Sequence, residues 1–96
     1  MTALNQEEID RELSKLNEGW YNRANTLVGE FFFKKYLGAL DFVNAVGLLA
    51  EQQQHHPSIK LEYGQVKIHI TTHDADNRLT YKDFKLAAAI DQILLE

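Results

Sequence analysis

Alternating apolar and polar residues between Ile59 and Thr71 predict a β-hairpin. Gly64-Gln65, a turn-forming pair, divides this stretch into two arms. If the pair is a two-residue loop that begins with glycine, every facing pair on one side is apolar: Tyr63 with Val66, Leu61 with Ile68, and Ile59 with Ile70. A hairpin with one buried face requires such pairing.

The open end of this predicted hairpin collects histidines. The same register, carried further, places His73 opposite His56, although Pro57 is expected to end the regular ladder before that point. His55 directly precedes His56. We therefore expect three imidazoles to meet at one end of one hairpin.

Two segments begin with a capping signature for an α-helix. Asn5 is followed three residues later by Glu8, and we expect this first helix to end at residues 17–19. Thr80 is followed three residues later by Asp83, and the helix that starts there runs to the end of the chain.

The longest predicted helix covers residues from about 35 to 54. Pro57 disfavours helical geometry at His56, so the helix should stop at or just before that residue. Its apolar residues recur at helical spacing: Tyr36, Leu40, Val43, Val46, Gly47 and Ala50, with Phe42 and Leu49 widening the stripe.

Two further strands are predicted ahead of this helix. Trp20 and Tyr21 begin a short strand, residues 22–25 turn the chain, and residues 26–34 form a second strand with Phe32 on its outer face. The order is therefore αββαββα. It predicts a single α+β domain over residues 1–96, with a four-stranded, mostly antiparallel sheet that carries three helices on one face.

Composition narrows the class of protein further. The formal net charge of −4 and the scattered basic residues argue against direct nucleic-acid binding. There is no cysteine for a disulfide or thiolate chemistry. The polar first residues do not resemble a signal peptide, and no apolar run approaches the roughly 20 residues that span a bilayer. These features predict a cytoplasmic protein without membrane contact.

Five residues are candidates for chemistry: Glu51, His55, His56, His73 and Asp83. Each also has a structural explanation. Histidines in the last turn of a helix interact favourably with its dipole, so His55 and His56 could be caps. Asp83 could serve only its capping box, and Glu51 could be a solvated charge.

The spacing of seven residues forms one pattern: Glu51, His55, His56, Pro57, Tyr63, His73 and Asp83. This pattern resembles the signature of the pterin-4a-carbinolamine dehydratase family. The likeness covers nearly the whole chain, including Gly19-Trp20, the aromatic residues 31–33 and Leu79-Thr80. The chain departs from it at Ile59, where vertebrate members have an aromatic residue, and at Asn77-Arg78, where many members have glycines.

The resemblance implies a lyase that removes water from 4a-hydroxytetrahydrobiopterin or a related 4a-hydroxytetrahydropterin. His55, His56 and His73 would line the pterin pocket, because imidazole can serve as acid or base near neutral pH. Glu51, Pro57 and Asp83 would help to bind the substrate or orient the histidines. The reaction requires no metal, nucleotide or redox cofactor, and the family forms homodimers or homotetramers.

Two other functions are consistent with the same residues. Three histidines and a carboxylate could hold zinc, but neighbouring histidines on a helix point roughly 100° apart, which suits a single tetrahedral ion poorly. Members of the family also act without catalysis, as dimerisation cofactors for a transcription factor or as assembly factors. The retention of all three histidines favours the enzyme.

Overall fold

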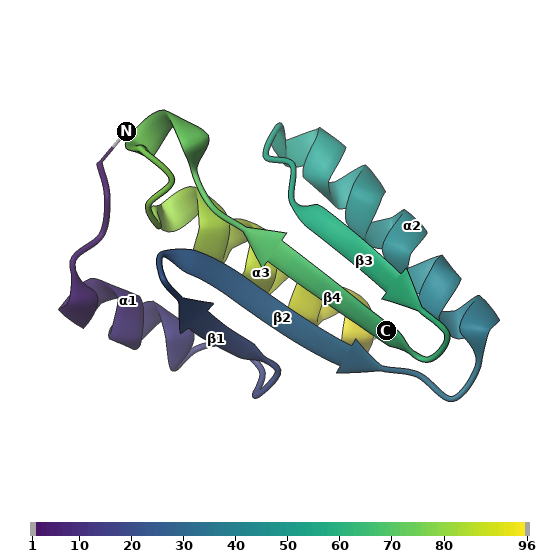
Figure 1. Cartoon of the computed structure of the whole chain (residues 1–96). Coiled ribbons are helices and arrows are strands. Elements are labelled where there is room, and N and C mark those ends of the chain that lie inside the picture. The colour runs from purple at the N-terminus through teal and green to yellow at the C-terminus, as the bar shows by residue number, and fades with distance from the viewer. Residues whose placement is uncertain (1, 96) are drawn as a thin grey trace.

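The computed structural model describes residues 2–95 and contains one antiparallel sheet with the strand order β1-β2-β4-β3 (Figure 1). The strands are β1 (Trp20–Arg23), β2 (Thr26–Phe32), β3 (Ser58–Glu62) and β4 (Gln65–Ile70). The helices are α1 (Gln6–Leu13), α2 (Tyr36–Gln53), α3 (Tyr81–Leu95) and a short 3-10 helix, η1 (His73–Ala75). The predicted α+β class and the order αββαββα are confirmed.

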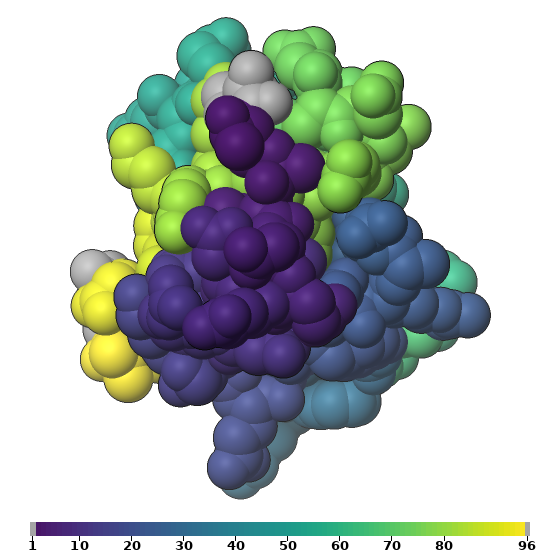
Figure 2. Space-filling view, turned by 90° about the vertical axis from the view of Figure 1, so that its left-hand side faces the viewer, coloured from purple at the N-terminus to yellow at the C-terminus, as the bar shows by residue number. Residues whose placement is uncertain are grey.

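The helices form a second layer against one face of the sheet. In Figure 1, α3 passes behind the central strands and α2 lies along the β3 side. Figure 2 shows α1, in purple, lying between α3, in yellow and yellow-green, and the blue β1–β2 hairpin. Within residues 2–95, no helix is long and apolar enough to cross a membrane.

The hydrophobic core lies between these two layers. Leu27 and Phe31 of β2 and Ile68 of β4 are buried together with Val46 of α2 and Ile90 of α3. Burial of such side chains is the main force that holds the two layers together. The outer face of the sheet is open, and Phe32, predicted to lie there, is 74% exposed.

The buried stripe of α2 differs in part from the predicted one. Ala39 and Phe42 are buried with Val46 and Ala50, whereas Tyr36 is exposed at the start of the helix and Gly47 is exposed as well. Because 18 apolar-rich residues offer several overlapping stripes at helical spacing, the pattern alone did not select the correct one.

The predicted register of the β3–β4 hairpin is wrong by two residues. Ile59 pairs with Ile68 and Leu61 with Val66, so the loop is Tyr63-Gly64. A shift of two residues keeps every side chain on the same face, so both registers match apolar with apolar residues. His73 consequently does not face His56 across a ladder: it begins η1 after β4 has ended.

Position 64 requires glycine because another part of the backbone lies very close to it. Its φ angle is not positive. A Cβ atom at this position would lie 2.7 Å from the carbonyl oxygen of Phe33. The carbonyl of Gly64 also accepts a hydrogen bond of 2.8 Å from the backbone N–H of Phe33. The loop is therefore fixed by its contact with the end of β2.

Both capping signatures form as predicted. Asn5 and Glu8 exchange side-chain and backbone hydrogen bonds at the start of α1, which ends at Leu13, earlier than expected. At the start of α3 the Asp83 carboxylate accepts from the backbone N–H of Thr80. The β1–β2 loop is Ala24-Asn25, both with positive φ, and so is shorter than the predicted turn.

Asp91 of α3 fastens the start of β1 to the helical layer. Its carboxylate accepts hydrogen bonds from the indole Nε1–H of Trp20 at 2.7 Å and from the backbone N–H of Asn17 at 2.9 Å. Trp20 and Asp91 are both buried. Loss of the carboxylate would leave two donors without their acceptor in a largely dry environment.

We predict that Asp91→Ala lowers the free energy of unfolding by about 2–3 kcal/mol, because it removes two hydrogen bonds to a charged acceptor. Chemical denaturation followed by circular dichroism measures the change, and the emission of Trp20, the single tryptophan, should shift to longer wavelength. Gln92→Ala, at the exposed neighbouring position, is the control and should leave both unchanged. Equal stability of Asp91→Ala and Gln92→Ala would contradict the prediction.

Candidate active site

A polar pocket of about 200 Å³ lies between the segment that follows α2 and the end of β4. All three histidines predicted to converge line it. The complete lining is Gln54, His55, His56, Thr71, Thr72, His73, Asp74 and Lys82. The adjacent His55 and His56 and the distant His73 thus border one cavity, although the hairpin register that predicted this meeting is wrong.

His55 and His56 lie beyond the end of α2. The helix ends at Gln53, and Gln54 adopts a left-handed conformation with φ 51°. The predicted end of the helix near Gln54 agrees with the structure, and the alternative in which the two histidines only cap the last helical turn does not describe it. His55 turns inward, with 11% of its side chain exposed, and His56 turns outward, with 59% exposed.

The ring of His55 is held by a buried carboxylate. Its Nε2 lies 2.7 Å from Oδ1 of Asp83, whose side chain is 0% exposed. Because a carboxylate only accepts hydrogen bonds, Nε2 carries the hydrogen. In the neutral ring, Nδ1 is then the nitrogen with a free lone pair.

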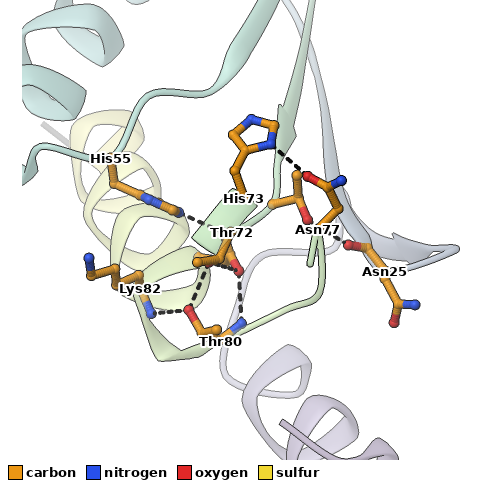
Figure 3. Close-up of polar contacts among 9 residues, drawn as sticks. Asn25, His55, Thr72, His73, Asn77, Thr80 and Lys82 are labelled. Atoms are coloured by element: carbon orange, nitrogen blue, oxygen red, sulfur yellow. Dashed lines mark hydrogen bonds and ion pairs between the residues drawn. The ribbon is translucent and has the colours of Figure 1, made fainter. Parts of the chain in front are cut away.

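Two threonines satisfy the rest of the Asp83 carboxylate. Its Oδ2 accepts from the Thr72 hydroxyl at 2.9 Å and from the backbone N–H of Thr80 at 2.8 Å. The Thr72 hydroxyl has one hydrogen, which it gives to Asp83, so in the 2.8 Å contact between the two hydroxyls Thr80 donates to Thr72. Figure 3 shows this network below His55 and His73.

His56 pairs with Glu51 at the surface. Its Nε2 lies 2.7 Å from Oε2 of Glu51, and both side chains are exposed. The hydrogen bond from His56, then its charge, and then the Gln54 amide lower the pKa of the Glu51 carboxyl below its ordinary value. Glu51 is therefore an anion that orients His56 at neutral pH.

His73 is held by an amide. Its Nδ1 lies 2.6 Å from Oδ1 of Asn77, and both residues are exposed (Figure 3). His55 and His73 therefore engage different ring nitrogens with the protein. Each of the three histidines keeps one nitrogen away from its protein partner, and such nitrogens can exchange protons with a bound molecule.

The remaining predicted site residues lie around the pocket without lining it. Glu51 stands behind His56, and Asp83 stands behind His55. Pro57 is half-buried and directly precedes β3. Tyr63 of the sequence pattern lies in the loop at the far end of the hairpin, with its ring 6.2 Å from that of Tyr36.

Six contributors to the site were not predicted from the sequence: Gln54, Thr71, Thr72, Asp74, Asn77 and Lys82. Thr72 and Asn77 act through hydrogen bonds that cannot be predicted from the spacing of residues in the sequence. Lys82 lines the pocket from the first turn of α3. The position of Lys82 beside the capping residues Thr80 and Asp83 was the available signal for it.

The zinc alternative finds no support in the geometry of residues 2–95. Among them, no group of three or more histidine, aspartate or glutamate side chains is placed to hold a metal ion.

A sequence model of the family described as Pterin 4 alpha carbinolamine dehydratase matches residues 2–93. A protein of Picosynechococcus sp. is 42% identical over 92 residues, which cover 96% of this chain and 98% of that protein. A protein of Chloroflexus aggregans is 43% identical over 94 residues, covering 98% and 99%. Both are provisionally named pterin-4-alpha-carbinolamine dehydratase.

Two solved structures are similar to this fold. The crystal structure of a transcriptional coactivator/pterin dehydratase from Brucella melitensis is 29% identical, with a TM-score of 0.88, and the match covers 96% of this chain and 98% of that chain. A pterin dehydratase-like RuBisCO assembly factor of the alpha-carboxysome is 23% identical, with a TM-score of 0.64 and coverage of 77% and 84%. The second likeness supports the fold alone.

We predict that the carboxyl group of Glu51 titrates at lower pH than an ordinary glutamate, and that His56→Ala raises its midpoint. A carboxyl whose pKa is lower in the folded state contributes stability at neutral pH and loses it as pH falls through the folded-state pKa. Carbon NMR of the side-chain carboxyl follows the titration. His69→Ala, which removes a histidine from β4, is the control and should leave the midpoint in place.

Proposed function

This chain belongs to the pterin 4 alpha carbinolamine dehydratase family, and we propose that it removes water from 4a-hydroxytetrahydrobiopterin or a related 4a-hydroxytetrahydropterin. The observation that carries the proposal is the meeting of His55, His56 and His73 around one pocket. Each ring is bound by the protein through one nitrogen. The other nitrogen of each is the atom that would act on a substrate.

The proposed reaction needs two proton movements. The C4a–O bond of the substrate breaks, and the leaving hydroxyl gains a proton to become water. The proton on N5 is removed, and its electron pair forms the N5–C4a double bond of the quinonoid dihydropterin. An acid and a base on either side of the ring would balance this step, and each contributes roughly 10²- to 10⁴-fold.

We assign these proton transfers to His55 and His73. His55 is backed by the Asp83 carboxylate, which stabilises a protonated imidazole through a charge-assisted hydrogen bond. This favours His55 as the base that takes the N5 proton. His73 is backed by a neutral amide, which gives an imidazolium less stabilisation, so His73 is better suited to give a proton to the leaving hydroxyl.

The other predicted residues would hold the substrate or the catalytic rings. His56, oriented by Glu51 and largely exposed, would contact the pterin at the pocket mouth. Asp83 is fully buried and saturated with protein donors, so its proposed role is to orient His55. Pro57 would stiffen the segment between His56 and β3.

We further propose a cytoplasmic homodimer or homotetramer that contacts neither membrane nor nucleic acid directly. Exposed leucines of α2, Leu37 and Leu48, supply apolar surface for a subunit contact. A non-catalytic role as a dimerisation or assembly cofactor is the second candidate. The name of the Brucella protein, a transcriptional coactivator/pterin dehydratase, motivates it.

We predict that the purified chain accelerates the decay of 4a-hydroxytetrahydropterin measured in a stopped spectrophotometric assay. His55→Ala and His73→Ala should each lower kcat by roughly 10²- to 10⁴-fold, because each removes a proton-transfer group. His56→Ala should raise KM more than it lowers kcat. Thermal unfolding of each variant confirms that the fold is kept.

His69→Ala is the matched control, since it removes a histidine that does not line the pocket, and it should retain activity. A wild-type chain that does not change the rate of decay would refute the enzymatic proposal and leave the cofactor role. Full activity of His73→Ala would refute the assignment of the proton transfers.

A further inference from the structure

The contact between Asn77 and His73 has no part in the fold of the two layers. Both residues are exposed, and their side chains meet at 2.6 Å between Oδ1 and Nδ1 (Figure 3). Asn77 and its neighbour Asp76 both have positive φ angles, 59° and 56°. Non-glycine residues in this region are uncommon, although Asn and Asp adopt it more readily than most, and such residues cluster at functional sites.

The loop that carries this contact is closed by its own backbone. The carbonyl oxygen of Thr72 accepts from the N–H groups of Ala75 and Asn77, each at 3.1 Å. The N–H of Thr72 donates to the carbonyl of Arg78 at 3.3 Å. Because the Thr72 hydroxyl is bound to buried Asp83, the base of the loop is fixed to the start of α3. Asn77 is thereby held at a constant place relative to His73.

The amide oxygen fixes the chemical state of the ring. A carbonyl oxygen only accepts, so Nδ1 of His73 carries the hydrogen, and Nε2 holds the lone pair in the neutral form. Nε2 points away from Asn77 (Figure 3). His55 has the opposite arrangement, with Nε2 bound to Asp83 and Nδ1 free. The site therefore contains two imidazoles in different tautomers.

We propose that Asn77 is a positioning residue that holds His73 as its Nδ1–H tautomer and directs Nε2 toward the substrate. The role deepens the proposed dehydratase function and rests on it, since His73 acts there as the proton donor. The imidazolium gives its Nε2 proton to the leaving hydroxyl and is left as the neutral Nδ1–H form, whose hydrogen Asn77 accepts. Asparagine suits the position because it tolerates left-handed backbone better than most residues and carries a short acceptor. The wrong tautomer of a catalytic histidine leaves the geometry intact and still costs activity.

Two substitutions distinguish the effect of the Asn77 side-chain amide from the effect of its left-handed backbone conformation. Asn77→Gly removes the acceptor and keeps the left-handed conformation without strain. Asn77→Asp keeps an oxygen acceptor at the same place. Asp76→Gly is the matched control, because it relaxes the neighbouring left-handed residue of the same loop and leaves Asn77 in place.

The experiment measures ring nitrogen shifts by 15N NMR of the wild-type protein and the three variants at alkaline pH, where imidazoles are neutral. The wild type, Asn77→Asp and Asp76→Gly should show His73 mainly as the Nδ1–H form, and Asn77→Gly should shift it toward Nε2–H. In the dehydration assay Asn77→Gly should lower kcat about tenfold with KM within about twofold, and Asp76→Gly should retain the rate.

Three results would overturn the inference: an Nε2–H form of His73 in the wild type, an unchanged tautomer in Asn77→Gly, or a changed tautomer with unchanged kcat. The first would mean that the Asn77 amide lies the other way round. The NMR measurement needs no substrate, so it decides the tautomer even if the wild type lacks dehydratase activity. Absent activity refutes the proposed function, and the NMR result refutes or supports the role of Asn77 in holding the ring.

Discussion

The buried carboxylate of Asp83 is the constraint on which the site depends. A carboxylate that is 0% exposed is tolerated only when its oxygens are supplied with donors. The Thr80 backbone, the Thr72 hydroxyl and the His55 ring supply them. These donors come from three places: the start of α3, the segment after β4, and the segment after α2. One anion therefore gathers the chain segments that border the pocket.

Local sequence rules predicted the elements of the fold well. The capping residues Asn5 and Thr80 and the alternation in β2 and β4 act over a few residues, so their outcome can be read directly. The hairpin register could not be read this way, because a shift of two residues preserves the apolar face. Contact with Phe33, distant in sequence, favours the register with Tyr63-Gly64 as its loop, and no local pattern reports that contact.

In the candidate site, too, some residues could be predicted from the local sequence, whereas the contacts between distant residues could not. The convergence of His55, His56 and His73 was predicted, but the argument for it used the wrong hairpin register. The partners of the rings could be named only in part. Asp83 was a candidate, whereas Asn77 had been noted only as a departure from the family pattern. A side-chain contact across a folded loop has no periodicity that a sequence would display.

The position of His55 and His56 just beyond the end of α2 has its own chemical consequence. His55 lies against a buried anion, and most of the side chain of His56 is in contact with water. Two identical side chains, adjacent in the sequence, thus have different chemical surroundings. Neither ring can take the part of its neighbour without leaving the carboxylate that holds it, which is Asp83 for His55 and Glu51 for His56.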